Sequence, residues 1–397
     1  MAIREEQAVS RRQGRLFTLV ALLLAALNLR LAVTSVGPVL REIQDGLGMS
    51  ATMAGLLTSV PVLCFASIGL AAPRLARRFG TAPVIFGGLL LLTAGLAVRP
   101  YTGGPILFLL LSAVAMAGIA LVNVLLPSVV KDKFPDQVGT VTGLYTVALN
   151  IGATTAAAAT VPLTNTFDDW RLGLAGWTLA ALIALPPWLL MARDRTAAGG
   201  PASQEQPAPV RVSRHPVAWA LALYFGMQST SAYVIIGWLP QIYRDAGISA
   251  EMAGVLFAVT SFLGIPLAFL LSALAGRLRS QSGIALVLGL FGIAGWGGLW
   301  ASPSAAPWLW AVFLGVVNTA FPLVLTMIAL RGKNPGTVVR LSAFAQGVGY
   351  LIAIPGPILI GALHDATGGW EVPLAVMAGL MIPQMLAGMA AGRNRQI

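Results

Sequence analysis

Residues 27–38 of this chain read Leu-Asn-Leu-Arg-Leu-Ala-Val-Thr-Ser-Val-Gly-Pro. The stretch lies inside an apolar run, from Leu16 to Leu40, that is long enough to cross a bilayer as a helix. Arg30 stands more than halfway along this run, and none of the fourteen Asp and Glu residues falls in the middle of an apolar run. A guanidinium at that depth is costly unless it faces a water-filled cavity or an anionic partner. We therefore predict a central cavity in which Arg30 meets a small anionic or strongly dipolar solute.

The composition indicates a protein that crosses the membrane many times. Of the 397 residues, 57% are apolar and 10% are charged, whereas soluble domains carry roughly 25% charged residues. The net charge of +11 predicts no nucleic-acid partner here, because the positive residues cluster in short loops between apolar runs, as cytoplasmic loops do. Cys64 is the only cysteine, and the two histidines, His215 and His364, stand at the ends of apolar runs. We expect no disulfide, no metal site and no cofactor.

Twelve apolar runs are long enough to span a bilayer. They are residues 16–39, 51–72, 82–99, 105–129, 140–162, 172–191, 216–238, 251–274, 283–301, 307–330, 338–361 and 372–391. Nineteen Lys and Arg residues fall on the side of this arrangement that holds both termini, and four fall on the other side. This asymmetry predicts that both termini face the cytoplasm.

A polar segment divides the spans into six and six. Residues 192–215 are rich in Pro, Gly, Ser and Gln and are predicted to form a flexible cytoplasmic linker. The halves also carry a repeat, since Ser-Ala-Thr-Met-Ala-Gly-Leu-Leu at 50–57 returns as Ser-Ala-Glu-Met-Ala-Gly-Val-Leu at 249–256. We predict an all-α membrane protein with a cytoplasmic tail (1–15), two pseudo-symmetric six-helix bundles (16–191 and 216–391) and a second cytoplasmic tail (392–397). Such halves are expected for secondary transporters of the major facilitator type, whose solute site lies between them near the midplane.

Three motifs carry a resemblance to known transporters. Residues 69–80, Gly-Leu-Ala-Ala-Pro-Arg-Leu-Ala-Arg-Arg-Phe-Gly, resemble the major facilitator loop signature, except that Pro73 stands near the place of the usual Asp. Residues 28–38 resemble the first helix of the cyanate and nitroimidazole porters, the CynX/NimT group, although Leu31 replaces an expected Pro. The run at 340–350, Arg-Leu-Ser-Ala-Phe-Ala-Gln-Gly-Val-Gly-Tyr, resembles span 11 of the same group. The resemblance implies a monomeric porter of small anions or small polar nitrogen compounds in a bacterial inner membrane.

Several polar residues are candidates to line the cavity with Arg30. Thr34 shares its helix face at i+4 spacing, whereas Asn28 points away and is expected either to join neighbouring helices or to bind solute. Asn123 and Asn318 each stand four residues before a Pro, where an Asn can satisfy a freed carbonyl or face the solute. Helices that line the cavity in this fold contribute the remaining candidates: Tyr145, Asn150, Gln228, Tyr233, Gln346 and Tyr350.

Four basic residues are candidates for a cytoplasmic gate. Arg74, Arg77 and Arg78 follow span 2, where the alternative is an ordinary positive loop. Arg340 begins span 11 and either reaches to the membrane surface or acts as a gate.

These patterns favour a porter of a small, cyanate-like or carboxylate-like anion. Such a porter could exchange one solute for another or carry a proton or cation together with the anion. The alternative is an exporter of a neutral drug or nitro-heterocycle, and a solute sensor is a remote third reading. An intramembrane enzyme would need a carboxylate pair, a His cluster or a nucleophile with its base inside the spans, and the sequence contains none. No P-loop sequence is present either.

Overall fold

The computed structural model describes residues 2–193, 212–333 and 335–397. Within these ranges the chain forms helices and no strands, and twelve spans are long and apolar enough to cross a membrane. The predicted all-α architecture with twelve spans is therefore confirmed. Most of the predicted linker at 192–215 lies outside the described residues.

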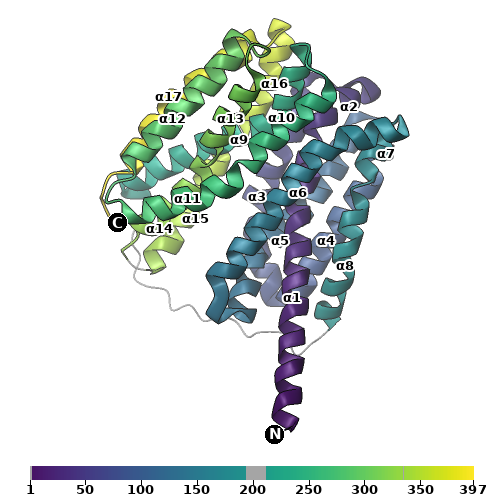
Figure 1. Ribbon diagram of the computed structural model, residues 1–397, viewed down its shortest axis with the longest axis vertical. Helices are drawn as coiled ribbons and strands as arrows, with labels where there is room; N and C mark the ends of the chain where they lie inside the picture. The colour runs from purple at the N-terminus through teal and green to yellow at the C-terminus, as the bar shows by residue number, and fades with distance from the viewer. Residues whose placement is uncertain (1, 194–211, 334) are drawn as a thin grey trace.

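The first half holds six spans built mainly from long unbroken helices (Figure 1). Its spanning helices are α1 (Ala2–Thr34), α3 (Ala51–Phe79), α4 (Thr81–Val98), α5 (Pro105–Lys133), α6 (Val138–Phe167) and α8 (Thr178–Arg193). Short elements connect them: η1 (Gly37–Val39), α2 (Leu40–Leu47), η2 (Arg99–Tyr101), η3 (Pro135–Gln137) and α7 (Trp170–Ala175). The polar start of the chain, expected as a tail, is thus continuous with the helix of the first span.

The second half repeats this arrangement with three of its spans broken. Its elements are η5 (Val212–Arg214), α9 (Pro216–Asp245), α10 (Ala250–Phe262), α11 (Gly264–Arg277), α12 (Ser282–Ala301), α13 (Pro307–Asn318), α14 (Ala320–Arg331), α15 (Pro335–Ala353), α16 (Pro355–Thr367) and α17 (Glu371–Ala391). One span consists of α10 and α11, one of α13 and α14, and one of α15 and α16. The break before Pro355 follows from its missing N–H, which removes one bond of the helix ladder.

The sequence repeat corresponds to the same helix start in both halves. Ser50 and Ser249 are the N-caps of α3 and α10, and each hydroxyl accepts a hydrogen bond of 3.2 Å from the backbone N–H three residues on. Gly48 and Gly247 precede them with φ of 62° and 88°, a region that favours glycine. The repeated letters therefore encode a turn and a capped helix.

Buried amides join the first and last spans of each half. In the first half, Asn28 on α1 donates to the carbonyl of Ala180 on α8 at 3.0 Å. In the second half, Gln228 on α9 accepts from Gln384 on α17 at 2.8 Å. Both Asn28 and Gln228 are buried. The two amides, 200 residues apart, thus have the same structural role of linking helices inside the bundle.

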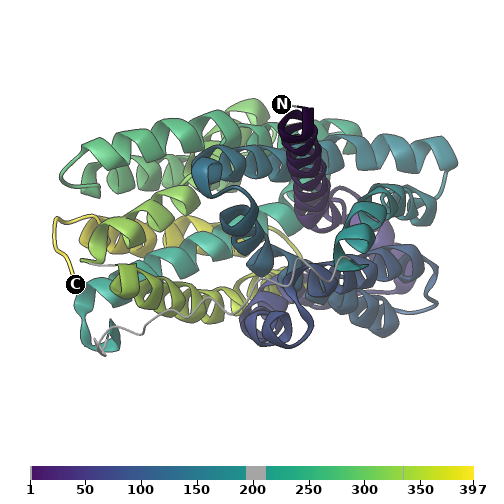
Figure 2. The same cartoon turned by 90° about the horizontal axis from the view of Figure 1, so that it is seen from below.

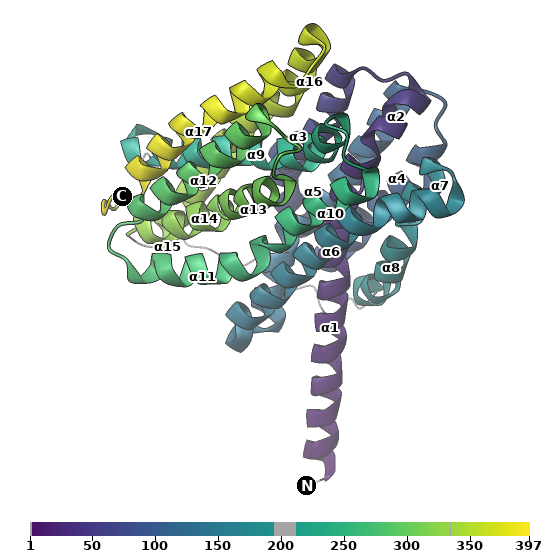
Figure 3. The ribbon, with the colours of Figure 1, turned by 45° about the horizontal axis from the view of Figure 1, so that its top comes forward.

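The two halves meet most closely at one end of the molecule. Helix α3 packs against α16, and α6 packs against α10. These pairs lie at the end of the molecule opposite the N-terminus, as Figure 1 and Figure 3 show. Figure 2, seen from below, places most of the first half, in purple to blue, on the right and the green to yellow second half on the left. We call the end where these pairs meet the far end.

Candidate functional site

Arg30 lies on α1 in the spanning part of the helix. Its side chain is half-buried, and its guanidinium forms no hydrogen bond or ion pair with any residue that the structure describes. Thr34, one turn further on, is buried and donates its hydroxyl to the Arg30 carbonyl at 2.8 Å. The helix therefore holds Arg30 in place through its backbone and leaves the charged group available.

Two tyrosines from the other half lie near Arg30. Tyr233 on α9 and Tyr350 on α15 both lie close enough to Arg30, and to each other, for the charge of one group to act on the next. Neither phenol hydroxyl has a hydrogen-bond partner in the described part of the chain. The three side chains come from both halves, as a solute site between the halves requires.

Aromatic rings support this cluster. Phe65 on α3 stacks on Tyr350 with ring centroids 5.9 Å apart and an interplanar angle of 24°. Phe225 on α9 meets the same tyrosine edge to face at 5.0 Å. The Phe65–Tyr350 contact crosses from the first half to the second. We call Arg30, Phe65, Tyr233 and Tyr350 the central cluster.

The chemistry of the central cluster favours a ligand that accepts hydrogen bonds. An arginine has only donors, a phenol can donate, and the cluster contains no carboxylate. A carboxylate, cyanate or nitro oxygen would accept from these groups, and a charge-assisted bond to Arg30 would be the strongest of the contacts. The stacked rings give a flat apolar wall for the rest of the solute.

Two predicted site residues belong instead to a polar network inside the second half. Gln228 is buried and donates to the side-chain oxygen of Asn318 at 3.2 Å, while it accepts from Gln384. Asn318 is the last residue of α13, next to the break in its span. This network joins α9, α13 and α17 inside the second half, with Gln384 Oε1 left without a hydrogen-bond partner among the described residues.

The other predicted site residues lie in different parts of the structure. Asn150 donates to the carbonyl of Thr146 at 2.9 Å, and Gln346 donates to the hydroxyl of Ser342 at 2.6 Å. Tyr145 packs against the core of the first half, and Asn123 is exposed on α5.

The predicted gate residues lie at the end of the molecule opposite the far end. Arg74, Arg77 and Arg78 are exposed in the last turns of α3, with the Arg78 guanidinium 5.2 Å from the ring centroid of Phe79. Arg340 is half-buried near the start of α15.

At the far end, crossed ion pairs join the halves. Arg244 at the end of α9 donates to both carboxylate oxygens of Glu42 on α2, at 2.7 and 2.8 Å. The neighbouring residues pair in the opposite sense, because Arg41 lies 3.3 Å from Asp245. From the sequence, Arg41 and Arg244 were counted among the four basic residues of the side away from the termini, and this pairing was not predicted. The available signal was an adjacent pair of opposite charges ahead of each copy of the repeat. We call these four residues the far-end latch.

Further contacts close the far end around this latch. Asp365 on α16 accepts from the backbone N–H groups of Ala51 and Thr52, at 3.0 and 2.7 Å, and so caps the start of α3 from the other half. Glycine allows the backbones to touch, since a Cβ on Gly361 would lie 2.2 Å from the Ala51 carbonyl oxygen. A Cβ on Gly55 would lie 2.3 Å from the carbonyl oxygen of Pro357. The halves are therefore tightly packed at this end.

Comparison with known proteins adds evidence independent of this geometry. The family model of the Major Facilitator Superfamily matches residues 22–354. The 2-nitroimidazole transporter of Escherichia coli (strain K12) is 35% identical over 97% of this chain and 98% of its own length. The cyanate transport protein CynX of the same organism is 33% identical over 92% of this chain and 95% of its own length. Among solved structures, a D-xylose-proton symporter superposes with a TM-score of 0.72 at 12% identity, covering 94% of this chain and 96% of that one.

Proposed function

Because this chain belongs to the Major Facilitator Superfamily, a family of transporters and not of enzymes, we propose that it carries a small anion across the membrane by alternating access. The solute would be cyanate-like or carboxylate-like, and Arg30 would bind its negative charge. Tyr233 and Tyr350 would donate hydrogen bonds to the same solute, with Phe65 against its flat face.

A single observation carries this proposal: the Arg30 guanidinium stands in a membrane span with no counter-ion among the described residues. An unpaired charge in that position is costly, and an incoming anion removes the cost. The relatives are consistent with this reading, since one is named for cyanate and one for a nitroimidazole, both small solutes with hydrogen-bond acceptor atoms.

The geometry suggests how solute binding and movement are linked. With both termini in the cytoplasm, as the charge asymmetry predicts, the far-end latch lies on the outer side of the membrane. The described state is then closed to the outside, and solute would reach Arg30 from the cytoplasm. Occlusion of an empty site would bury an unpaired guanidinium, so the empty carrier is disfavoured from closing. This supports exchange, in which the carrier returns with a second solute bound.

A second candidate is export of a neutral nitro-heterocycle. The stacked rings of Phe65 and Tyr350, with Phe225 behind them, favour it, because an aromatic solute would extend the stack. In this reading Arg30 would contact the nitro oxygens or would hold helices together.

The two candidates are separated by thermal stabilisation of the purified protein with a panel of small anions and nitro-heterocycles. The variants are Arg30→Ala and Arg30→Lys, and Arg171→Ala is the matched control because it removes a guanidinium that lies 4.6 Å from the Trp170 ring, away from the central cluster. We expect an anion to raise the Tm of the wild type and the control, and not that of Arg30→Ala. Stabilisation by neutral heterocycles alone, unchanged in Arg30→Ala, would refute the anion anchor and support the second candidate.

The tyrosine donors give a further prediction. Tyr350→Phe removes one hydroxyl and keeps the ring that stacks on Phe65. A hydrogen bond to a charged group contributes about 1.5–3 kcal/mol, so the Kd for the anion should rise about tenfold or more. Isothermal titration of wild type and variant measures this change, and an unchanged Kd would exclude the hydroxyl from the solute contact.

A further inference from the structure

A second arginine is buried in the first half without a counter-ion. Arg99 begins η2 directly after α4, and its side chain is only 1% exposed. One nitrogen, Nη2, donates to the carbonyl of Ala32 on α1 at 3.3 Å. The Nε and Nη1 atoms are buried and have no hydrogen-bond partner in the described chain. No carboxylate among the described residues pairs with Arg99 either.

Arg331 shows how this fold accommodates a buried arginine that needs no ligand. It is 2% exposed, and its nitrogens donate to the carbonyls of Ala391 and Gly392 at 3.1 and 2.9 Å. It also donates to the side-chain oxygen of Gln281. Arg99 has a single protein acceptor by comparison. Its other contact is the Phe108 ring, with the centroid 5.8 Å away, and a cation–π contact of that kind does not replace a counter-ion.

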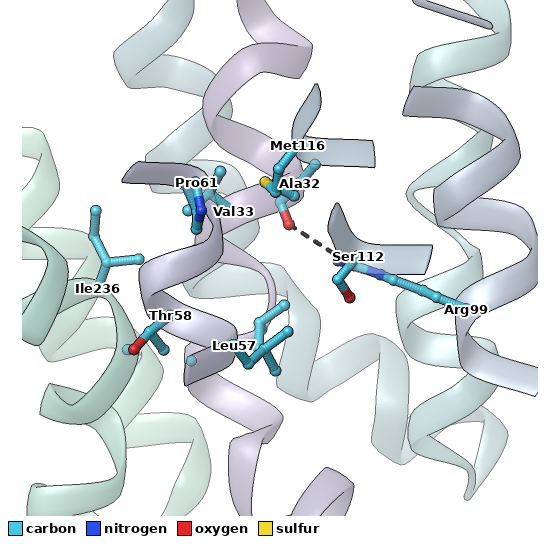
Figure 4. A pocket seen from close by; sticks show the side chains of 12 residues that line it. Ala32, Val33, Leu57, Thr58, Pro61, Arg99, Ser112, Met116 and Ile236 are labelled. Carbon is cyan, nitrogen blue, oxygen red and sulfur yellow. Dashed lines mark hydrogen bonds between the residues drawn. The ribbon is translucent and has the colours of Figure 1, made fainter. Parts of the chain in front are cut away.

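Arg99 lines a small cavity together with a second unpartnered polar group. The cavity has a volume of about 20 Å³, and its walls include Ala32, Val33, Leu57, Ser112 and Ile236 (Figure 4). The Ser112 hydroxyl is buried and makes no hydrogen bond within the described residues. Thr58 also lines the cavity, with its hydroxyl donated to the Gly55 carbonyl at 2.9 Å, and the other walls named here are apolar. The volume admits one small occupant, since a single water needs about 10–15 Å³.

The uncompensated charge of Arg99 favours an anion over water. The free groups of Arg99 are all donors, and Ser112 can orient its hydroxyl to donate as well. A water molecule could accept from Arg99 and donate to the Ser112 oxygen, but it would leave the charge uncompensated. A small anion accepts from every group and also neutralises the guanidinium. We propose that Arg99 and Ser112 form a binding site for one halide-sized inorganic anion, separate from Arg30.

The position of the cavity connects this anion to the closed far end. Val33 on α1 and Gly37 in η1 line the cavity from the first half, and Ile236 and Gly237 line it from α9 in the other half. The η1 and α9 backbones touch here, because a Cβ on Gly37 would lie 2.3 Å from the Ile236 carbonyl oxygen. An anion in the cavity would compensate the buried charge while the halves are together. The bound halide therefore stabilises the state that is closed at the far end. This inference does not depend on the solute proposed above.

The first test compares the Tm of the purified full-length protein in sodium chloride, bromide and gluconate at equal ionic strength. Gluconate is too large for the cavity. We expect the wild-type Tm to rise by a few degrees in either halide relative to gluconate. Arg99→Met should abolish this rise, Ser112→Ala should reduce it, and Arg30→Gln should keep it. Equal Tm values for the wild type in all three salts, or a full halide response in Arg99→Met, would overturn the proposal.

A second measurement needs no variant, so a misfolded Arg99→Met does not block the test. Crystals of the wild-type protein grown in sodium bromide should give an anomalous peak beside Nη1 and Nε of Arg99. An ordered Arg99 with no such peak would overturn the proposal. The outcome is independent of the anion porter: if solute still stabilises the protein through Arg30 while halide has no effect, only the Arg99 site fails. If halide acts through Arg99 and no solute acts through Arg30, only the transport proposal fails.

Discussion

Replacing Glu42 by Gln removes one charge from the strongest contact of the far-end latch. The shape of the side chain is retained, and one of its two contacts with Arg244 can persist as a hydrogen bond from the guanidinium to the uncharged amide oxygen. Because Glu42 lies on α2 and Arg244 on α9, the contact exists only while the halves are together at this end. The variant should therefore destabilise the closed state relative to a state open at the far end.

The magnitude follows from the geometry and exposure of the pair. The side chains of Arg244 and Glu42 are 16% and 31% exposed, with the closest N–O distance at 2.7 Å. Hydrogen bonds to charged groups contribute about 1.5–3 kcal/mol, while exposed ion pairs contribute about 0.2–1 kcal/mol. For this partly exposed bidentate pair we expect about 1–2 kcal/mol, a factor of about 5 to 30 in the ratio of closed to open molecules.

Double electron–electron resonance measures this ratio. Spin labels at Thr166→Cys on α6 and Met252→Cys on α10 report the distance between the halves, and both positions are exposed. Cys64 is the only native cysteine, so a Cys64→Ala background carries no other label. Arg171→Gln is the control, because it removes a charge from α7 whose aromatic contact lies within the first half.

The double-mutant cycle decides whether the pair is responsible. Glu42→Gln and Arg244→Gln should each shift the distribution toward the open distance, and the double variant should shift it by less than the sum. The comparison needs conditions in which the closed and open populations are both resolved. An unchanged distance distribution in Glu42→Gln under those conditions would refute this reasoning. Additive effects of the two substitutions would refute it as well.

Two further predictions concern packing. Gly361→Ala places a Cβ 2.2 Å from the Ala51 carbonyl oxygen and should destabilise the closed state by about 1–3 kcal/mol. The same spin labels should then report a larger open population. Gly347→Ala is the control and should behave as wild type, because its Cβ would meet nothing within 4 Å. Asn28→Ala removes the hydrogen bonds to the carbonyls of Leu24 and Ala180 and should lower stability by about 1–2 kcal/mol. Its Tm should fall while solute still gives the wild-type Tm increment, and a lost increment would instead assign Asn28 to the solute site.

The span count could be predicted from sequence because hydropathy over about 20 residues reports the length of a helix in a bilayer. The break before Pro355 follows from a residue with known backbone chemistry. The break after Asn318 does not follow from its proline alone, because Pro322 stands four residues after Asn318 as Pro127 stands four after Asn123, and α5 is continuous there. Whether a helix is continuous depends on individual backbone hydrogen bonds, and a hydropathy averaged over many residues does not report them.

The candidate site was likewise predictable from the sequence only in part. The depth of Arg30 in its span is a property of one helix and was predicted from sequence. The surroundings of Gln228 depend on how α9 is rotated against α17, and this rotation places the amide in a buried network with Gln384. The pairing of Glu42 with Arg244 joins positions 202 apart in the chain. Contacts of this kind are set by packing between helices, which one sequence does not record.

The broken spans have a mechanical consequence. In the first half α3, α5 and α6 are continuous over 29, 29 and 30 residues, whereas their counterparts in the second half are each divided in two. A helix bends most easily where ladder bonds are already missing. We therefore expect the two halves to differ in stiffness, because the second half can bend at the breaks in its three divided spans. Elastic deformation during a transport cycle should concentrate at the three joints, and the amides beside them should exchange hydrogen faster than those at matching depths of the first half.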